Sequence, residues 1–84
     1  MFPLDEAGLR WLVVDEDAVA FLRETRDERV LVVVARAPWS GAVLPRWLAP
    51  DGEAQGLHGS GLRVDQSGVH LAGDGPGVGV WRLR

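Results

Sequence analysis

The sequence predicts an all-β fold, a two-sheet antiparallel β-sandwich of the Greek-key type with about seven short strands. Several segments alternate apolar and polar residues with a period of two, as half-buried strands do. Glycine, proline and aspartate separate these segments at spacings of about ten residues. The third observation is an unbroken apolar run from Val30 to Ala35. We expect residues 1–84 to form one such domain.

The run from Arg29 to Ala37 is the segment around which the other strands should be arranged. It places six consecutive apolar residues, four of them valine, between two arginines. β-Branched side chains fit a pleated sheet better than a helix, and a continuous apolar run leaves no side for water. The sequence therefore predicts an interior strand that is covered on both faces.

Two strands should precede this run. The first spans Leu9 to Val14, with Leu9, Trp11 and Val13 on one face and Arg10, Leu12 and Val14 on the other. The second spans Ala18 to Thr25. A helix is the alternative for this second segment, but its short length and the turn residues at both ends favour a strand. The charged residues 26–28 should form the hairpin turn into the interior strand.

The pieces after Gly41 are shorter. Proline and glycine identify a loop over Ala49 to Gly56, followed by a stub at Leu57 and His58. Alternation on either side of a Gln-Ser-Gly turn predicts a hairpin. The remaining expected strands are Ala42 to Leu44, Leu62 to Asp65, Val69 to Ala72 and Val78 to Leu83.

Composition excludes several classes of function. The net charge is −3, with nine basic and twelve acidic residues and no basic cluster, which argues against nucleic acid as a partner. The chain has no cysteine, no apolar run long enough for a membrane span and no signal-peptide pattern at its N-terminus. We therefore expect a soluble, cytoplasmic domain without a membrane partner.

No motif indicates a catalytic site, a metal site or a bound cofactor. The glycine-rich segment 73–77 lacks the phasing and the following helix of a phosphate-binding loop. The acidic residues 15–17 lack the further oxygen ligands of a calcium loop. His58 and His70 lack a second ligand pair at metal spacing. We therefore interpret these segments as turns and propose no active site from them.

The four tryptophans are the most informative large side chains. A domain of 84 residues cannot easily bury four indoles, so at least one should lie at a surface. Trp11 and Trp81 fall on expected strands, which favours a core or interface position. Trp39 and Trp47 flank the loop-rich middle and are the candidates for an interface or a sugar contact. The alternative for these two is a cap over the open end of the sandwich.

Three segments resemble a known family. They are Ala20 to Glu24, Asp27 to Ala37 and the ending Gly79 to Leu83. Together they are similar to the C-terminal β-sandwich domain of the α-amylase superfamily, glycoside hydrolase family 13, and within it to neopullulanases, cyclomaltodextrinases and maltogenic amylases. The likeness extends from about Leu9 to Leu83. This chain has Ala35 where that family usually has asparagine.

The resemblance implies a noncatalytic accessory domain. In that family, the catalytic acids belong to a (β/α)8 barrel, and the C-terminal domain packs on that barrel and stabilises it, with occasional α-glucan contact. The barrel of a parent enzyme is thus the expected partner, and the chain alone should have no activity. The alternatives are a small carbohydrate-binding module that uses Trp39 and Trp47, and an unrelated protein-interaction domain. An isolated domain of this kind should form a weak homodimer through an apolar face.

Overall fold

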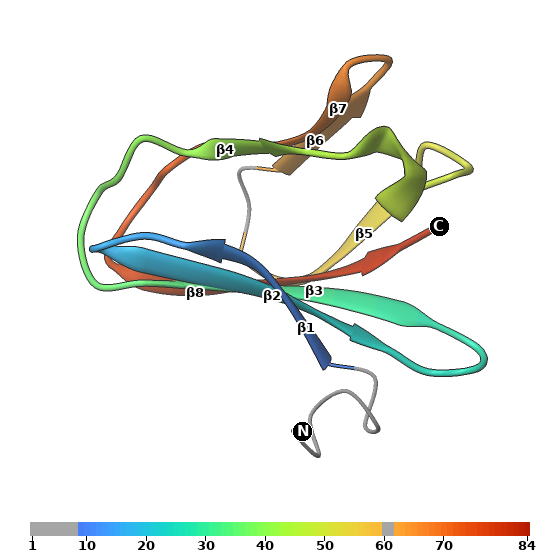
Figure 1. Cartoon of the computed structure of the whole chain (residues 1–84), viewed down its shortest axis with the longest axis horizontal. Coiled ribbons are helices and arrows are strands. Elements are labelled where there is room, and N and C mark those ends of the chain that lie inside the picture. The colour runs from blue at the N-terminus through green and yellow to red at the C-terminus, as the bar shows by residue number, and fades with distance from the viewer. Residues whose placement is uncertain (1–8, 60–61) are drawn as a thin grey trace.

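The computed structural model describes residues 9–59 and 62–84, and these form eight antiparallel strands in two sheets (Figure 1). The larger sheet contains β1 (Leu9–Val14), β2 (Ala18–Glu24), β3 (Arg29–Ala35), β5 (Ala54–His58) and β8 (Gly77–Leu83). The smaller sheet contains β4 (Ala42–Leu44), β6 (Leu62–Asp65) and β7 (Gly68–Leu71). A single 3₁₀ turn, η1 (Arg46–Leu48), follows β4. The predicted two-sheet antiparallel β-sandwich is confirmed.

The apolar run does form the interior strand of the larger sheet. The strand order is β1-β2-β3-β8-β5, and every residue of β3 from Arg29 to Ala35 has a partner on both β2 and β8. The segment Ala18–Glu24 is a strand rather than a helix, because β1 and β3 pair with it on its two sides and together satisfy its backbone groups. The turn before β3 closes with a hydrogen bond of 2.9 Å from the Thr25 N–H to the Glu28 carbonyl.

The core lies between the two sheets. One face of the larger sheet presents Leu22, Leu31 and Trp81 in one cross-strand row, and all three are buried. The smaller sheet and η1 cover this face with their own apolar side chains. Those covering side chains are Leu44, Leu48, Ala49, Val69 and Leu71. We call this covered side of the larger sheet the inner face and the opposite side the outer face.

The expectation that β3 is covered on both faces is wrong for the part of the chain that the structure describes. Leu31, Val33 and Ala35 are buried on the inner face, whereas Val34 is 40% exposed on the outer face. The apolar run predicted two apolar faces, but only one sheet is available to cover them. The residues that the structure describes therefore place no second layer on the outer face of β3.

The predicted alternation in β1 is also wrong beyond Trp11. Trp11 pairs with Phe21, but the register then shifts, so that Val13 pairs with Ala20 and Val14 pairs with Val19. A bulge adds one residue to one strand, which moves every following side chain to the opposite face. Val13 therefore packs against the core, and Val14 lies on the outer face with Trp11. Simple alternation had placed Val13, and not Val14, on the same face as Trp11.

The predicted loop over Ala49 to Gly56 is too long. Residues Ala54 to His58 form β5, which includes the predicted stub at Leu57 and His58, and β5 pairs with β8 at the edge of the larger sheet. The strand is almost entirely exposed and does not alternate in polarity, so no local pattern marks it. Its backbone hydrogen bonds to β8 define it instead.

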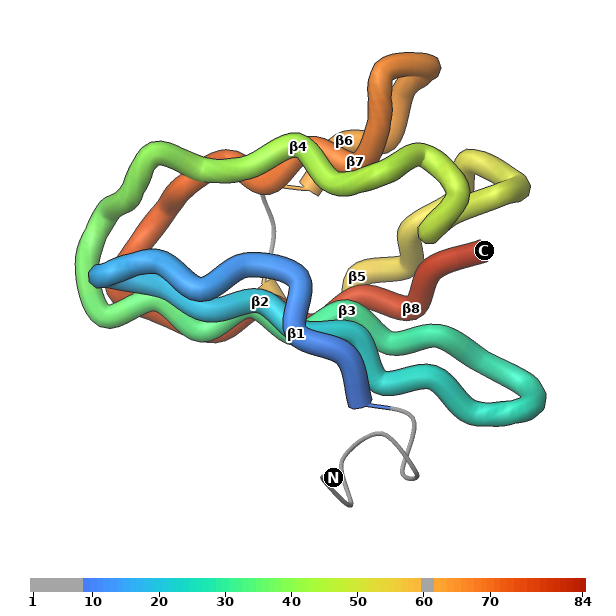
Figure 2. The backbone as a smooth tube through the Cα atoms, in the orientation of Figure 1, coloured from blue at the N-terminus to red at the C-terminus, as the bar shows by residue number. Residues whose placement is uncertain are grey.

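Two of the connections between the sheets, β3 to β4 and β7 to β8, lie together at one end of the sandwich. Figure 2 shows the segment after β3 and the segment before β8 running side by side as they cross between the layers. A hydrogen bond of 2.9 Å from the Trp39 N–H to the Gly73 carbonyl joins them. Gly73 has a φ of 82°, and a Cβ at this position would collide with the Trp39 carbonyl. This close approach therefore requires glycine.

Candidate interaction surface

The outer face of the larger sheet carries a continuous row of apolar side chains across four strands. The register aligns Trp11 of β1 with Phe21, Phe21 with Val32, and Val32 with Val80 of β8. Aligned residues of neighbouring strands point to the same side of a sheet and contact one another. The Trp11 and Phe21 rings are tilted by 58° at 5.3 Å between centroids, within the range of favourable aromatic pairs. The row ends at His58 on the edge strand β5.

A second row runs parallel to the first. It aligns Val14 with Val19, Val19 with Val34, and Val34 with Val78. Val14, at the end of the edge strand β1, is 77% exposed, and Val78, on the interior strand β8, is 45% exposed. We call the eight side chains of the two rows the outer apolar face. Its members are Trp11, Val14, Val19, Phe21, Val32, Val34, Val78 and Val80.

Charged residues border this surface at both ends of the strands. At one end, Arg82 Nε lies 3.0 Å from Glu28 Oε2, as an ion pair whose N–H is not aligned for a hydrogen bond. At the other end, Arg36 Nε donates to Asp17 Oδ1 at 3.1 Å. An apolar centre with an aromatic pair and a charged border is typical of a protein interface. The arrangement therefore suits packing against another apolar surface.

The structure places the sequence candidates Trp39 and Trp47 at opposite ends of β4. Trp39 lies on the connection before β4, whereas Trp47 lies on η1 after it. The Trp47 indole is 53% exposed, and the Arg10 guanidinium carbon lies over it, 5.8 Å from the ring centroid. This distance is within the range of a cation–π contact. The two indoles therefore do not form one groove.

The other two tryptophans divide between core and surface. Trp81 is 6% exposed and belongs to the core, whereas Trp11 is 51% exposed on the outer face. From the sequence, we expected both residues on strands, in the core or at an interface, and the structure places Trp81 in the core and Trp11 at the surface. The sequence alone did not identify the seven other members of the outer apolar face. A sheet order with β1, β2, β3 and β8 adjacent would have shown that their apolar residues align on both sides.

A cluster of Asp65, Ser67 and His70 on the β6–β7 hairpin was also missed. Asp65 Oδ1 accepts hydrogen bonds from the Ser67 hydroxyl at 2.6 Å and the Ser67 N–H at 2.9 Å. His70 Nε2 lies 2.9 Å from both Asp65 Oδ1 and Ser67 Oγ. The hydrogen bond from the Ser67 hydroxyl, followed by those from His70 and the Ser67 backbone, holds the pKa of the Asp65 carboxyl well below its usual range.

This cluster does not have the geometry of a nucleophilic triad. In a triad, the carboxylate holds one imidazole nitrogen while the other nitrogen faces the serine. Here the carboxylate and the hydroxyl share the same nitrogen, Nε2 of His70. The Asp65 side chain caps the hairpin turn through the Ser67 N–H. We therefore interpret the cluster as a turn that stabilises the hairpin.

Within residues 9–59 and 62–84, no group of three metal-ligating side chains comes together. His58 lies on β5 of the larger sheet and His70 on β7 of the smaller one, so the two histidines are on different layers. None of the helical residues in this part of the chain forms a helix long and apolar enough to cross a bilayer.

Comparison of the chain with family models, curated proteins and solved structures finds no match.

Proposed function

We propose that this chain is a noncatalytic accessory domain of an α-glucan-acting glycoside hydrolase of the neopullulanase type. The domain packs through the outer apolar face on the catalytic (β/α)8 barrel and stabilises the parent enzyme. The observation that carries this proposal is the uncovered face itself, with two aligned apolar rows and a charged border. The resemblance of the β2–β3 and β8 segments to C-terminal domains of that family supplies the identity of the partner.

The energetics favour a permanent contact of this kind. Removing apolar surface from water stabilises a complex by about 25 cal/mol per Å². A domain of 84 residues has a small core and a narrow stability margin. Covering Trp11, Val14 and Val34 with a neighbouring domain would therefore add to the stability of both partners.

Three acidic side chains, Glu24, Asp17 and Glu28, have a structural role in ion pairs. Glu24 accepts a hydrogen bond from Arg29 at 3.0 Å and lies 3.8 Å from Arg10. Asp17 pairs with Arg36, and Glu28 with Arg82. Hydrolysis of a glycosidic bond requires two carboxyl groups held across a substrate. These carboxylates are instead engaged in ion pairs at strand ends and turns.

The carbohydrate-binding alternative finds less support. It uses Trp39 and Trp47 as the sugar contacts, and these residues lie at opposite ends of β4, so they do not form one groove. An unrelated protein-interaction domain could use the same outer apolar face. The similarity of the β2–β3 sequence to the glycosidase family makes the accessory domain the better of these two proposals.

The reading frame around the coding sequence of this chain tests the proposal directly. We expect a frame that continues into a (β/α)8 barrel with a pair of catalytic carboxylates. In that full protein, Trp11→Ser should lower the melting temperature, whereas Trp47→Ser, which changes an equally exposed indole, should not. A frame without any barrel, or equal effects of the two substitutions, would contradict the proposal.

A further inference from the structure

Asp51 and Asp74 are the two aspartates of this chain that directly precede a glycine. The backbone nitrogen of the residue after an aspartate can attack the carbonyl carbon of the aspartate side chain and close a five-membered succinimide ring. Such an intramolecular attack is efficient when the two atoms can reach each other, and glycine has no side chain that hinders the approach. Both Asp-Gly pairs are therefore candidate sites of this chemical modification.

The two pairs differ in how the attacking nitrogen is held. The Gly52 N–H donates a hydrogen bond of 2.8 Å to the Ala49 carbonyl. The Gly75 N–H lies outside the strands and donates to no acceptor among residues 9–59 and 62–84. Attack requires the nitrogen to lose its proton, so an N–H that already donates must first break its hydrogen bond. The nitrogen of Gly75 is therefore the freer nucleophile of the two.

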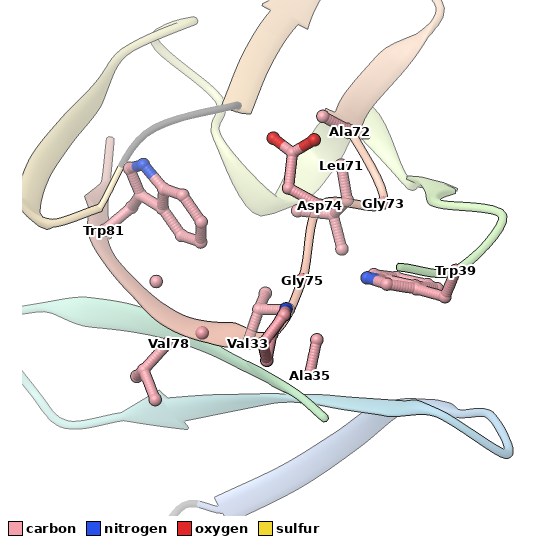
Figure 3. Close-up of a pocket in the computed structure, with 13 residues that line it drawn as sticks. Val33, Ala35, Trp39, Leu71, Ala72, Gly73, Asp74, Gly75, Val78 and Trp81 are labelled. Carbon is pink, nitrogen blue, oxygen red and sulfur yellow. The ribbon is translucent and has the colours of Figure 1, made fainter. Parts of the chain in front are cut away.

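The carboxyl group of Asp74 is also free to rotate. Asp74 is exposed, and its side chain forms no ion pair and no hydrogen bond within the part of the chain that the structure describes. Figure 3 shows this carboxylate pointing away from Gly75, in the lining of a pocket of about 170 Å³. The open space beside it allows rotation about the Cα–Cβ bond toward the Gly75 nitrogen. Electrophile and nucleophile are therefore both unengaged at this pair.

We propose that Asp74 is a site of spontaneous isoaspartate formation. The Gly75 nitrogen bonds to Cγ of Asp74 and loses its proton, and the hydroxyl of the protonated carboxyl group leaves with that proton as water. A second water molecule then adds to one of the two ring carbonyls. Opening of the bond to Cγ restores aspartate, whereas opening of the bond to the main-chain carbonyl carbon leaves isoaspartate. The main chain of the product passes through the side-chain methylene group.

The lengthened main chain disturbs the end of the sandwich where the two connections cross. The Gly73 carbonyl accepts the Trp39 N–H at 2.9 Å, and Gly75 lies so close to Ala37 that a Cβ would collide with the Ala37 carbonyl. Isoaspartate inserts one methylene group between these two contacts, so one of them must open. The site belongs to the β7–β8 connection and not to the outer apolar face, so its failure would leave the proposed accessory role intact.

Peptide mapping of the full chain after prolonged incubation in neutral buffer tests the proposal. Tryptic peptides that carry Asp51 and Asp74 are separated from their isoaspartate isomers by chromatography. Methyl transfer from S-adenosylmethionine by an isoaspartate-specific methyltransferase identifies those isomers. We expect isoaspartate to accumulate about fivefold faster at position 74 than at position 51, the factor equivalent to the net contribution of one amide hydrogen bond. In urea that unfolds the chain, this ratio should fall toward one, because the Gly52 hydrogen bond is lost.

Two matched substitutions locate the reaction. Asp74→Glu should abolish methyl transfer at its own position, because glutamate would have to close a six-membered ring, whereas Asp51→Glu should leave the rate at position 74 unchanged. Both aspartates are exposed, so both variants should keep the fold, and the amide spectrum verifies this. Faster conversion at position 74 that depends on the folded state would support the proposal. Equal or faster conversion at position 51 in the folded chain, a ratio unchanged by urea, or no conversion at position 74 would overturn it.

Discussion

The two faces of the five-stranded sheet have nearly the same apolar composition and opposite surroundings. On the inner face, Leu22, Leu31 and Trp81 form a row that the smaller sheet and η1 cover. On the outer face, Trp11, Phe21 and neighbouring valines form regular rows that no other strand within residues 9–59 and 62–84 covers. Neighbouring residues of one strand are therefore both apolar, but one contacts the core and the next lies on the outer face.

An apolar pattern shows that a strand face suits contact with other apolar groups, but it does not show whether the chain covers that face. The run in β3 is apolar on both sides because both sides suit contact with other apolar groups. Among residues 9–59 and 62–84, only the inner side finds such contact, since the smaller sheet has three strands and lies on one side. The remaining face is the basis of the proposed accessory role.

The largest expected effect is a loss of stability on the inner face. Leu31 is fully buried, and Leu31→Ala removes its side-chain contacts and leaves a cavity in the core. Such substitutions cost about 2–5 kcal/mol. Urea denaturation followed by tryptophan fluorescence should show this loss as a lower midpoint. A cost below about 1 kcal/mol would mean that the inner face is not the core of the domain.

Two neighbouring valines of β3 provide a sharper contrast, because the same substitution tests both faces. Val33 is 8% exposed on the inner face and Val34 is 40% exposed on the outer face. Val33→Ala should destabilise the isolated domain by about 2 kcal/mol, whereas Val34→Ala should cost about 1 kcal/mol or less. Parallel urea titrations measure both. Equal costs would indicate that the outer face is covered in solution.

The smallest expected effect is that of low pH on the stability of the domain, because the apolar contacts on both sheet faces do not titrate. The pKa of Asp65 is lowered in the folded state, so its contribution is present above the unfolded value of about 3.9 and is lost as the pH falls below it. Asp65→Asn should therefore flatten the loss of stability below about pH 4. Thermal unfolding at a series of pH values checks this. An unchanged acid dependence in the variant would contradict the assigned hydrogen bonds.

The sequence predicted those strands whose side chains show a pattern of alternation or β-branching. Alternation and β-branching located β2, β3 and β8, and turn residues located the β6–β7 hairpin. The edge strand β5 was missed because backbone pairing with β8 defines it, and its exposed side chains carry no pattern. The bulge in β1 was missed for a similar reason, since one extra residue is visible only against the partner strand.

The candidate surface could be predicted only in part. The sequence indicated that tryptophans would outnumber the positions available in a small core, and Trp11 is indeed exposed. It could not show that Trp11 aligns with Phe21 and Val32, because that alignment depends on the strand order and on the register.

Sedimentation velocity of the isolated chain tests the central claim, that the outer apolar face is the docking surface. Trp11 and Trp47 are exposed to nearly the same extent, at 51% and 53%, but only Trp11 belongs to this face. Between about 10 μM and 1 mM, the wild type and Trp47→Ser should show a rising sedimentation coefficient, as expected for weak self-association. Trp11→Ser should remain monomeric throughout. A monomeric wild type at about 1 mM, or equal behaviour of the two variants, would contradict the account.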